Sequence, residues 1–149
     1  MDRYHSGEIA LPPLGARTVR ADLVFYGVDQ SGPSYEARVF LNTPEATIDT
    51  PTDLANGYVG SFTIFGHAGC AGAPGHCDEP VEREDPFDVR TPRGVPRISR
   101  LVILGGEELK RLSGETFSLT LVPVEAGPEG PVPSKALDFS SFRLATYES

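Results

Sequence analysis

One stretch, YVGSFTIFGHAGCAGAPGHCD at residues 58–78, changes character halfway along its length. Its first part, up to Phe65, is rich in apolar, aromatic and β-branched residues, and this composition favours a β-strand. Its second part is a glycine-rich loop that holds both cysteines of the chain and two of the three histidines. The stretch therefore predicts a strand that runs directly into a loop with potential chemistry.

Short apolar runs of the same kind recur along the chain, separated by many of its 16 glycines and 14 prolines. Both residue types break helices, and valine, threonine and aromatic residues favour strands. The sequence therefore predicts an all-β fold, an antiparallel β-sandwich or jelly-roll-like domain with one short helix. Strands are expected at 18–26, 35–42, 57–65, 98–104 and 115–124, a helix at 106–112, and one or two final strands within 137–147.

Alternation of apolar residues indicates which faces of two of these strands are buried. In the strand at 18–26 the apolar face comprises Val19, Ala21, Leu23 and Phe25, and in that at 35–42 it comprises Tyr35, Ala37, Val39 and Leu41. The turn residues between them, GVDQSGP, fit either a hairpin or two adjacent strands of a sandwich.

A length of 149 residues fits one domain with a sizeable core. Residues 1–17 contain Pro12-Pro13 and are expected to form an extended lead-in, followed by a single β-sandwich at 18–149. The charged, proline-rich segment 78–96 is expected to be an exposed loop, and its length indicates a role in facing a partner. The sequence does not identify which side chain would enter a partner, and Tyr26 and Phe87 are two loop aromatics that could.

The formal net charge of −8 argues against two classes of partner. An acidic chain repels the phosphates of nucleic acids and the surface of anionic membranes. No apolar run approaches the roughly 18 residues of a membrane span, and no signal peptide is visible. The sequence thus leaves the location open: cytoplasmic, exported with a partner, or a fragment of a longer protein.

The sequence contains no recognisable catalytic motif. There is no G-x-S-x-G elbow, no phosphate-binding P-loop, no H-E-x-x-H and no dinucleotide-binding glycine pattern. Most carboxylates are scattered in polar segments, as expected for a solvated surface. We therefore expect the chain not to be an enzyme.

The loop after residue 65 contains four candidate metal ligands, His67, Cys70, His76 and Cys77, spaced H-x-x-C-x5-H-C. Thiolate and imidazole together suit copper(I) or zinc(II), although this is not a standard zinc-finger spacing. The alternative is a Cys70–Cys77 disulfide that braces the loop, which would contribute about 2–3 kcal/mol in the chain-entropy model. A redox switch is a third possibility. The residues themselves leave these three alternatives open.

Several segments, in this order along the chain, carry a family resemblance: ARVFLNTPEA at 37–46, GYVGSFTIFGH at 57–67, residues 98–112, and FSLTLVP at 117–123. They resemble parts of the C-terminal domain of tyrosinases and polyphenol oxidases, the type-3 copper protein family. Residues 37–46 resemble its opening strand, 57–67 its "GSF…H" strand, and 98–112 and 117–123 its closing strand, short helix and "LVP" strand. The continuation from Gly69-Cys70 to His76-Cys77-Asp78 is similar to bacterial versions. The resemblance covers roughly residues 18–147.

This resemblance implies a β-sandwich that docks on a copper oxidase and shields its active-site entrance, with a cysteine pair that assists copper delivery. The oxidase itself is not implied, because a type-3 centre needs six histidines on a helical bundle and this chain has three. The expected partner is therefore a type-3 copper oxidase domain or subunit, and the one cofactor suggested is copper. The alternative function is a structural or oligomerisation module that self-associates and has a disulfide-braced loop.

Overall fold

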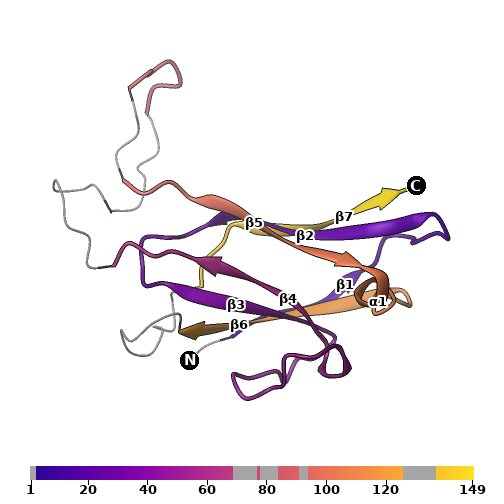
Figure 1. Ribbon diagram of the computed structural model, residues 1–149. Helices are drawn as coiled ribbons and strands as arrows, with labels where there is room; N and C mark the ends of the chain where they lie inside the picture. Colours follow the sequence, from indigo (N-terminus) through magenta and orange to yellow (C-terminus); the bar gives the residue numbers. More distant parts are fainter. Residues whose placement is uncertain (1–2, 69–76, 78–83, 91–93, 126–136) are drawn as a thin grey trace.

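The computed structural model describes residues 3–68, 77, 84–90, 94–125 and 137–149 and shows two β-sheets packed face to face (Figure 1). The four-stranded sheet has the order β1-β6-β3-β4, and the three-stranded sheet has the order β5-β2-β7. Every strand pair is antiparallel. The strands are β1 (Tyr4–Ala10), β2 (Thr18–Val28), β3 (Tyr35–Leu41), β4 (Tyr58–Ile64), β5 (Ile98–Gly105), β6 (Thr116–Glu125) and β7 (Ser141–Glu148).

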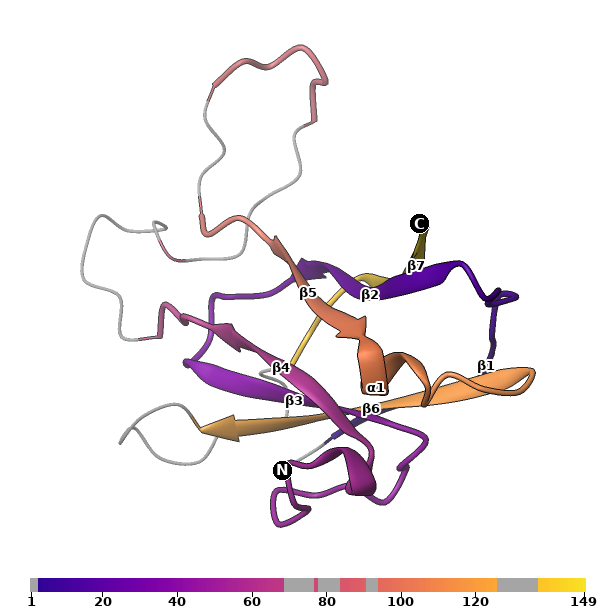
Figure 2. The same ribbon diagram turned by 45° about the vertical axis from the view of Figure 1, so that its right-hand side comes forward.

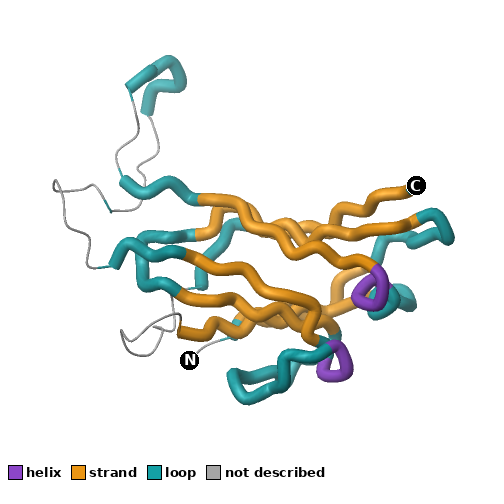
Figure 3. The backbone as a smooth tube through the Cα atoms, in the orientation of Figure 1, coloured by secondary structure: helices purple, strands orange, loops and turns teal. Residues whose placement is uncertain are grey.

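The predicted fold class is confirmed: this is an all-β antiparallel sandwich with very little helix (Figure 3). One α-helical turn, α1 (Gly106–Leu109), follows β5, and one 3-10 turn, η1 (Leu54–Asn56), precedes β4. The helix is shorter than the predicted 106–112. It starts from Gly105 without a side-chain cap, and Ser113-Gly114 follows soon after it, so the sequence supports only a turn.

Of the two alternatives for residues 18–26 and 35–42, a hairpin or two adjacent strands of a sandwich, the hairpin is wrong. Strand β2 pairs with β5 and β7, whereas β3 pairs with β4 and β6 in the other sheet. Each of the two strands directs one apolar face into the core, and this would hold equally for neighbours in one sheet and for strands in opposite sheets. The connection at 29–34 crosses from one sheet to the other, as the two views show (Figures 1 and 2).

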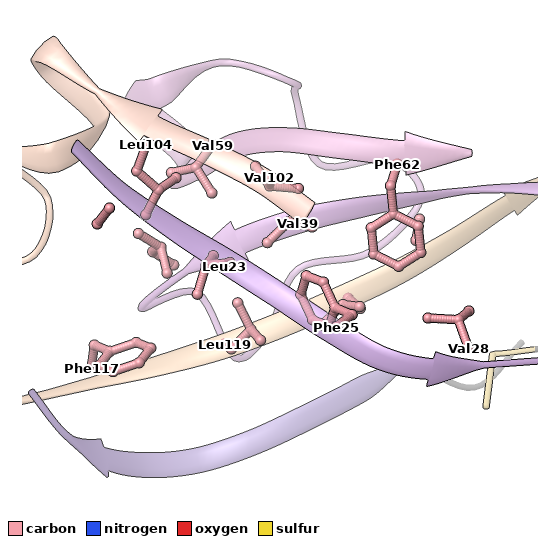
Figure 4. Close-up of a cluster of buried hydrophobic side chains, with 14 of the residues drawn as sticks. Leu23, Phe25, Val28, Val39, Val59, Phe62, Val102, Leu104, Phe117 and Leu119 are labelled. Atoms are coloured by element: carbon pink, nitrogen blue, oxygen red, sulfur yellow. The ribbon is translucent and has the colours of Figure 1, made fainter. Parts of the chain in front are cut away.

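The core lies between the sheets and contains the predicted apolar faces (Figure 4). Ala21, Leu23 and Phe25 are fully buried, and so is the predicted face of β3. The exception is Val19, which is 52% exposed at the start of β2, beyond the end of the core. Phe25 is the aromatic centre of the core: its ring packs 5.0 Å from that of Phe62 and 5.5 Å from that of Phe139.

The N-terminal residues are part of the sandwich rather than only a lead-in to it. Strand β1 pairs with β6 and forms one edge of the four-stranded sheet. Its Tyr4 packs edge-on against Phe139, 4.9 Å between ring centroids. At the other end of the chain the expected one or two strands are a single strand, β7. The sandwich thus begins at about residue 4 and not at 18.

The outer face of the four-stranded sheet is covered by the connection between β3 and β4. Phe40 points to this face and is fully buried in a small cluster with Ala46 and Val122. Arg3 fixes the connection by donating hydrogen bonds to the carbonyl oxygens of Glu45 and Ala46, at 3.0 and 2.9 Å. The run 117–123 of β6 is consequently buried on both faces.

Candidate functional site

The predicted strand-to-loop stretch leaves the sandwich at Phe65 and is held against the turn after β2. The backbone N–H groups of His67 and Ala68 donate to the carbonyl oxygens of Gln30 and Gly32, at 3.1 and 3.0 Å. The N–H of Gly66 donates to the Ser34 hydroxyl at 2.9 Å. These bonds fix the start of the loop on the body of the protein.

Position 66 requires glycine for reasons of space. A Cβ atom there would overlap the carbonyl oxygen of Gly32 and the backbone of Pro33. The glycine in the sequence before His67 is therefore explained by the close approach of two backbone segments, which only glycine permits. The approach places His67 at a defined position at this end of the sandwich.

His67 is half-buried, and its Nδ1 atom lies 2.9 Å from the carbonyl oxygen of Gln30. A carbonyl oxygen only accepts hydrogen bonds, so Nδ1 carries the proton in this contact and Nε2 of the neutral ring keeps its lone pair. A histidine whose Nδ1 donates to a backbone carbonyl is typical of metal ligands, and it is equally a satisfied structural histidine. The geometry prepares His67 for either role.

The remaining predicted ligands are only partly described. Cys70 and His76 lie outside the described residues. Cys77 is described, and its sulfur is not a free thiol. Among residues 3–68, 77, 84–90, 94–125 and 137–149, no three histidine, cysteine or acidic side chains are grouped so that they could hold a metal ion. The choice between a Cys70–Cys77 disulfide, a copper or zinc site and a redox switch stays a prediction.

The hydroxyl group of Tyr35 is buried, and sequence reasoning had not singled it out. Tyr35 is 1% exposed, and its hydroxyl oxygen has no hydrogen-bond partner among the described residues. Burial raises the pKa of this hydroxyl, and the negative charges of Asp29 and Asp138 raise it further. Tyr35 therefore stays neutral and acts as a packing residue rather than as an acid or base at neutral pH.

Residues 84–90 form a braced tip within the predicted exposed loop, and they stand clear of the two sheets (Figure 2). Asp85 accepts a hydrogen bond from the Phe87 N–H at 2.9 Å. Asp88 accepts one from the Arg90 N–H at 3.0 Å and forms an ion pair with the Arg90 guanidinium at 2.7 Å. These contacts hold the pKa of the Asp88 carboxyl below its usual value. The tip thus has local order of its own.

The tip displays two apolar side chains to solvent. Phe87 is 87% exposed and Val89 is 94% exposed, the highest values among the large apolar residues described. Phe65, where the chain leaves β4, is 73% exposed. Sequence reasoning had named Phe87 but not Val89. Its other aromatic candidate, Tyr26, is half-buried within strand β2 and is not a loop residue.

A second polar feature, absent from the sequence predictions, lies on the outer face of the three-stranded sheet. Asp22 points outward by alternation, yet it is only 2% exposed because Arg20 covers it with two hydrogen bonds of 2.7 and 2.6 Å. The Tyr147 ring packs 5.0 Å from the Arg20 guanidinium. Arg20 lowers the pKa of the Asp22 carboxyl, and a side-chain hydrogen bond from Tyr147 lowers it too.

The described surface also contains a pocket of about 420 Å³ near η1 and α1. Its basic side chains already have partners: Lys110 pairs with Glu107 at 2.7 Å, and Arg111 donates to the carbonyl oxygen of Leu54. The polar residues that line the pocket also include Asn42, Thr43, Asn56 and Ser113. It has no arrangement of nucleophile and base that would indicate catalysis.

Comparison with known proteins adds no assignment: no family model, no curated protein and no solved structure matches this chain. The fold and the site therefore define only a class, an antiparallel β-sandwich with a loop-bearing end. Over the described residues, no helix has both the length and the apolar character needed to cross a lipid bilayer. The resemblance to the tyrosinase C-terminal domain stays a prediction.

Proposed function

We propose that this chain is a non-catalytic accessory β-sandwich that docks on a type-3 copper oxidase and shields its active-site entrance. The observation that carries the proposal is the braced tip at 84–90 with Phe87 and Val89 on display. The sequence resemblance supplies the class of partner. The all-β fold is compatible with this role but does not by itself specify it.

The structure of the tip suits insertion into another protein. A single exposed phenylalanine lowers the stability of a protein little. When a hydrogen-bonded turn holds it in place, less conformational entropy is lost on binding a partner. Charged residues surround the two apolar side chains, with Asp85 before them, Asp88 between them and Arg90 after them. An apolar centre with a polar rim is the usual composition of a protein-binding hot spot.

The loop from His67 to Cys77 provides the second part of the proposal, transfer of copper to the partner. Its support is the contact of His67 Nδ1 with the Gln30 carbonyl oxygen, which in the neutral ring leaves the Nε2 lone pair available to a metal ion. The thiols of a reduced cysteine pair would complete a soft site suited to copper(I). This part rests on the resemblance together with one described side chain.

The docking role is tested with a type-3 copper oxidase encoded by the same organism. We expect the chain to co-purify with the oxidase and to slow its oxidation of a diphenol. The double variant F87A/V89A should raise the dissociation constant about tenfold or more, as loss of a hot spot does. Ile48→Ala, which truncates an apolar side chain that is 47% exposed on the β3–β4 connection, is the matched control and should bind like the native chain.

Failure to form a complex, together with unchanged oxidase activity, would refute the shielding role. The copper role is tested separately by titrating copper(I) into reduced protein. Binding should weaken in the double variant C70S/C77S and, to a smaller degree, in His67→Ala. Copper binding that is the same in all three proteins would remove the loop from consideration.

A further inference from the structure

The two sheets have four edge strands, β1 and β4 in one sheet and β5 and β7 in the other. An edge strand exposes a row of unpaired backbone N–H and C=O groups and is a template for pairing with another strand. Proteins usually interrupt or cover their edges to prevent this. Comparison of the four edges shows that β7 differs from the other three.

Three edges are interrupted or covered. In β1 the pairing with β6 shifts register between His5 and Glu8, and Gly7 has a left-handed φ of 70°, so the strand is bulged. Strands β4 and β5 lie against each other at one side of the sandwich. There the Arg100 guanidinium donates to the carbonyl oxygen of Thr63, 3.3 Å away.

Strand β7 is regular. Its pairing with β2 runs without a shift from Arg20↔Tyr147 to Tyr26↔Ser141, and it contains no glycine or proline. In the part of the chain that the structure describes, no strand other than β2 pairs with it. Most of its side chains are exposed, including Tyr147 at 47%. Figure 1 shows the strand reaching the C-terminus at the rim of the sandwich.

We infer that β7 pairs antiparallel with β7 of a second copy of this chain, so that two three-stranded sheets become one six-stranded sheet. A second copy fits this edge better than an unrelated strand, because pairing with a second copy leaves no new free edge. Two-fold pairing of β7 with itself satisfies both free edges at once, and the new sheet then ends on both sides at β5, which already lies against β4. A single added strand would instead expose its own outer edge.

The register follows from the alternation of side chains. A two-fold axis perpendicular to the sheet keeps outward residues outward, so odd-numbered residues of β7 must face odd-numbered residues of the second copy. Pairing about Ala145 places two small residues opposite each other at the axis. It also places Arg143 opposite Tyr147 of the other copy, twice, a cation–aromatic contact of the kind that Arg20 already makes with Tyr147.

Other registers are less favourable. Pairing about Arg143 would set two guanidinium groups directly opposite each other, and like charges in this position destabilise a sheet. Pairing about Leu144 would place Arg143 opposite Ala145 and lose both aromatic contacts. The inferred register is therefore the one about Ala145. This inference is independent of the docking role assigned to the 84–90 tip, because the two surfaces do not share a residue.

Sedimentation of the whole chain at physiological ionic strength tests the dimer, since salt screens the repulsion between two chains of charge −8. We expect a monomer–dimer equilibrium in which dimers predominate by about 100 µM chain. Ala145→Lys should raise the dissociation constant about tenfold or more, because it puts like charges opposite each other at the axis. Leu101→Lys adds the same charge to the same sheet face on β5 and should leave the equilibrium unchanged.

A cysteine scan tests the register. Opposed residues of an antiparallel pair have Cα atoms about 4.5–5.5 Å apart, within disulfide range. Ala145→Cys should therefore cross-link to itself on mild oxidation. Arg143→Cys should not, since its two copies would lie about 14 Å apart at four residues' offset. A chain that stays monomeric at every concentration overturns the inference, and so does a dimer that Ala145→Cys fails to cross-link or that Leu101→Lys weakens as much as Ala145→Lys.

Discussion

The outer faces of the two sheets are built in opposite ways. On the four-stranded sheet the outward Phe40 is fully buried, because the β3–β4 connection folds over it. On the three-stranded sheet the outward Leu101 and Ile103 are 46% and 52% exposed, and the one buried outward side chain described there is a carboxylate, Asp22. One face is closed by the chain's own connection, and the other is open.

The difference shows that an outward position does not determine exposure. Phe40 and Leu101 are both apolar and both point away from the core, yet only Phe40 is covered. Asp22 is polar and points outward, yet Arg20 covers it. A position is buried where another segment or side chain lies over it, and exposed where none does. The closed face contributes to stability, whereas the open face leaves apolar side chains exposed to solvent.

The largest expected effect is on the closed face. Phe40→Ala should lower the free energy of unfolding by about 3–5 kcal/mol, the usual cost of emptying a buried phenylalanine site. Leu101→Ala, its counterpart on the open face, should change it by less than about 0.5 kcal/mol. Urea unfolding measures both values. Equal losses for the two variants would contradict the proposed contrast between the faces.

A smaller loss is expected where the covering connection rejoins the sheet. Gly57 has a φ of 84°, and a Cβ atom there would overlap the side chain of Thr43 and the carbonyl oxygen of Leu41. Gly57→Ala should therefore cost about 2 kcal/mol in unfolding free energy. Gly32→Ala, at a glycine with open space around it, is the control. The claim fails if both alanine variants unfold at the same urea concentration.

On the open face we expect an effect that depends on pH. Arg20 lowers the pKa of Asp22 in the folded state, so the ionised carboxylate stabilises the fold above the unfolded-state pKa near 3.8. This contribution is lost as the pH falls through the lower, folded-state pKa. Asp22→Asn should therefore reduce stability at pH 7 and make the loss below pH 4 less steep. Thermal melts from pH 2 to 7 measure this. If the melting temperature of Asp22→Asn falls below pH 4 as steeply as that of the native chain, the result argues against the ion pair.

The smallest effect is expected from a substitution that removes hydrogen bonds to the β3–β4 connection and leaves the apolar cluster beneath it intact. Arg3→Ala removes two hydrogen bonds to the connection, one exposed and one part-buried, and should cost about 1 kcal/mol. Hydrogen exchange of the Ala46 amide, which donates to Thr43, should speed up in this variant. Arg17→Ala, which removes hydrogen bonds to Ser149 at the other side of the fold, is the control and should leave this amide unchanged.

Much of the fold followed from alternation alone. The buried faces of β2 and β3 were predicted correctly at every position except Val19, because a strand with one apolar face has one stable orientation. The pairing of these strands was not predictable, because alternation states which face is buried and not which strand lies beside it. Strand β1 was not predicted for a related reason. The half-buried pattern of residues 4–10 has no clear period, and only its pairing with β6 makes it a strand.

For the candidate site the sequence was informative about residue types and not about arrangement. It identified the cysteine and histidine loop, since glycine-rich segments are recognisable by composition, and it offered Phe87 only as one of two aromatic candidates. It could not place His67 against Gln30, because that contact joins residues far apart in the chain. It also missed the Arg20–Asp22 pair and Val89, for which no local pattern distinguishes a covered or displayed side chain from an ordinary surface one.

By itself, the sequence determined that this chain is an all-β protein, with identified core faces and a chemically distinctive loop after residue 65. Those properties depend on local spacing and on the conformational limits of glycine, proline and β-branched residues. Only the tertiary structure decided that β2 and β3 oppose each other, that the connection after β3 closes one outer face, and that β7 is left as a regular edge. These features depend on which distant segments meet, and burial, pKa values and free edges all follow from that arrangement.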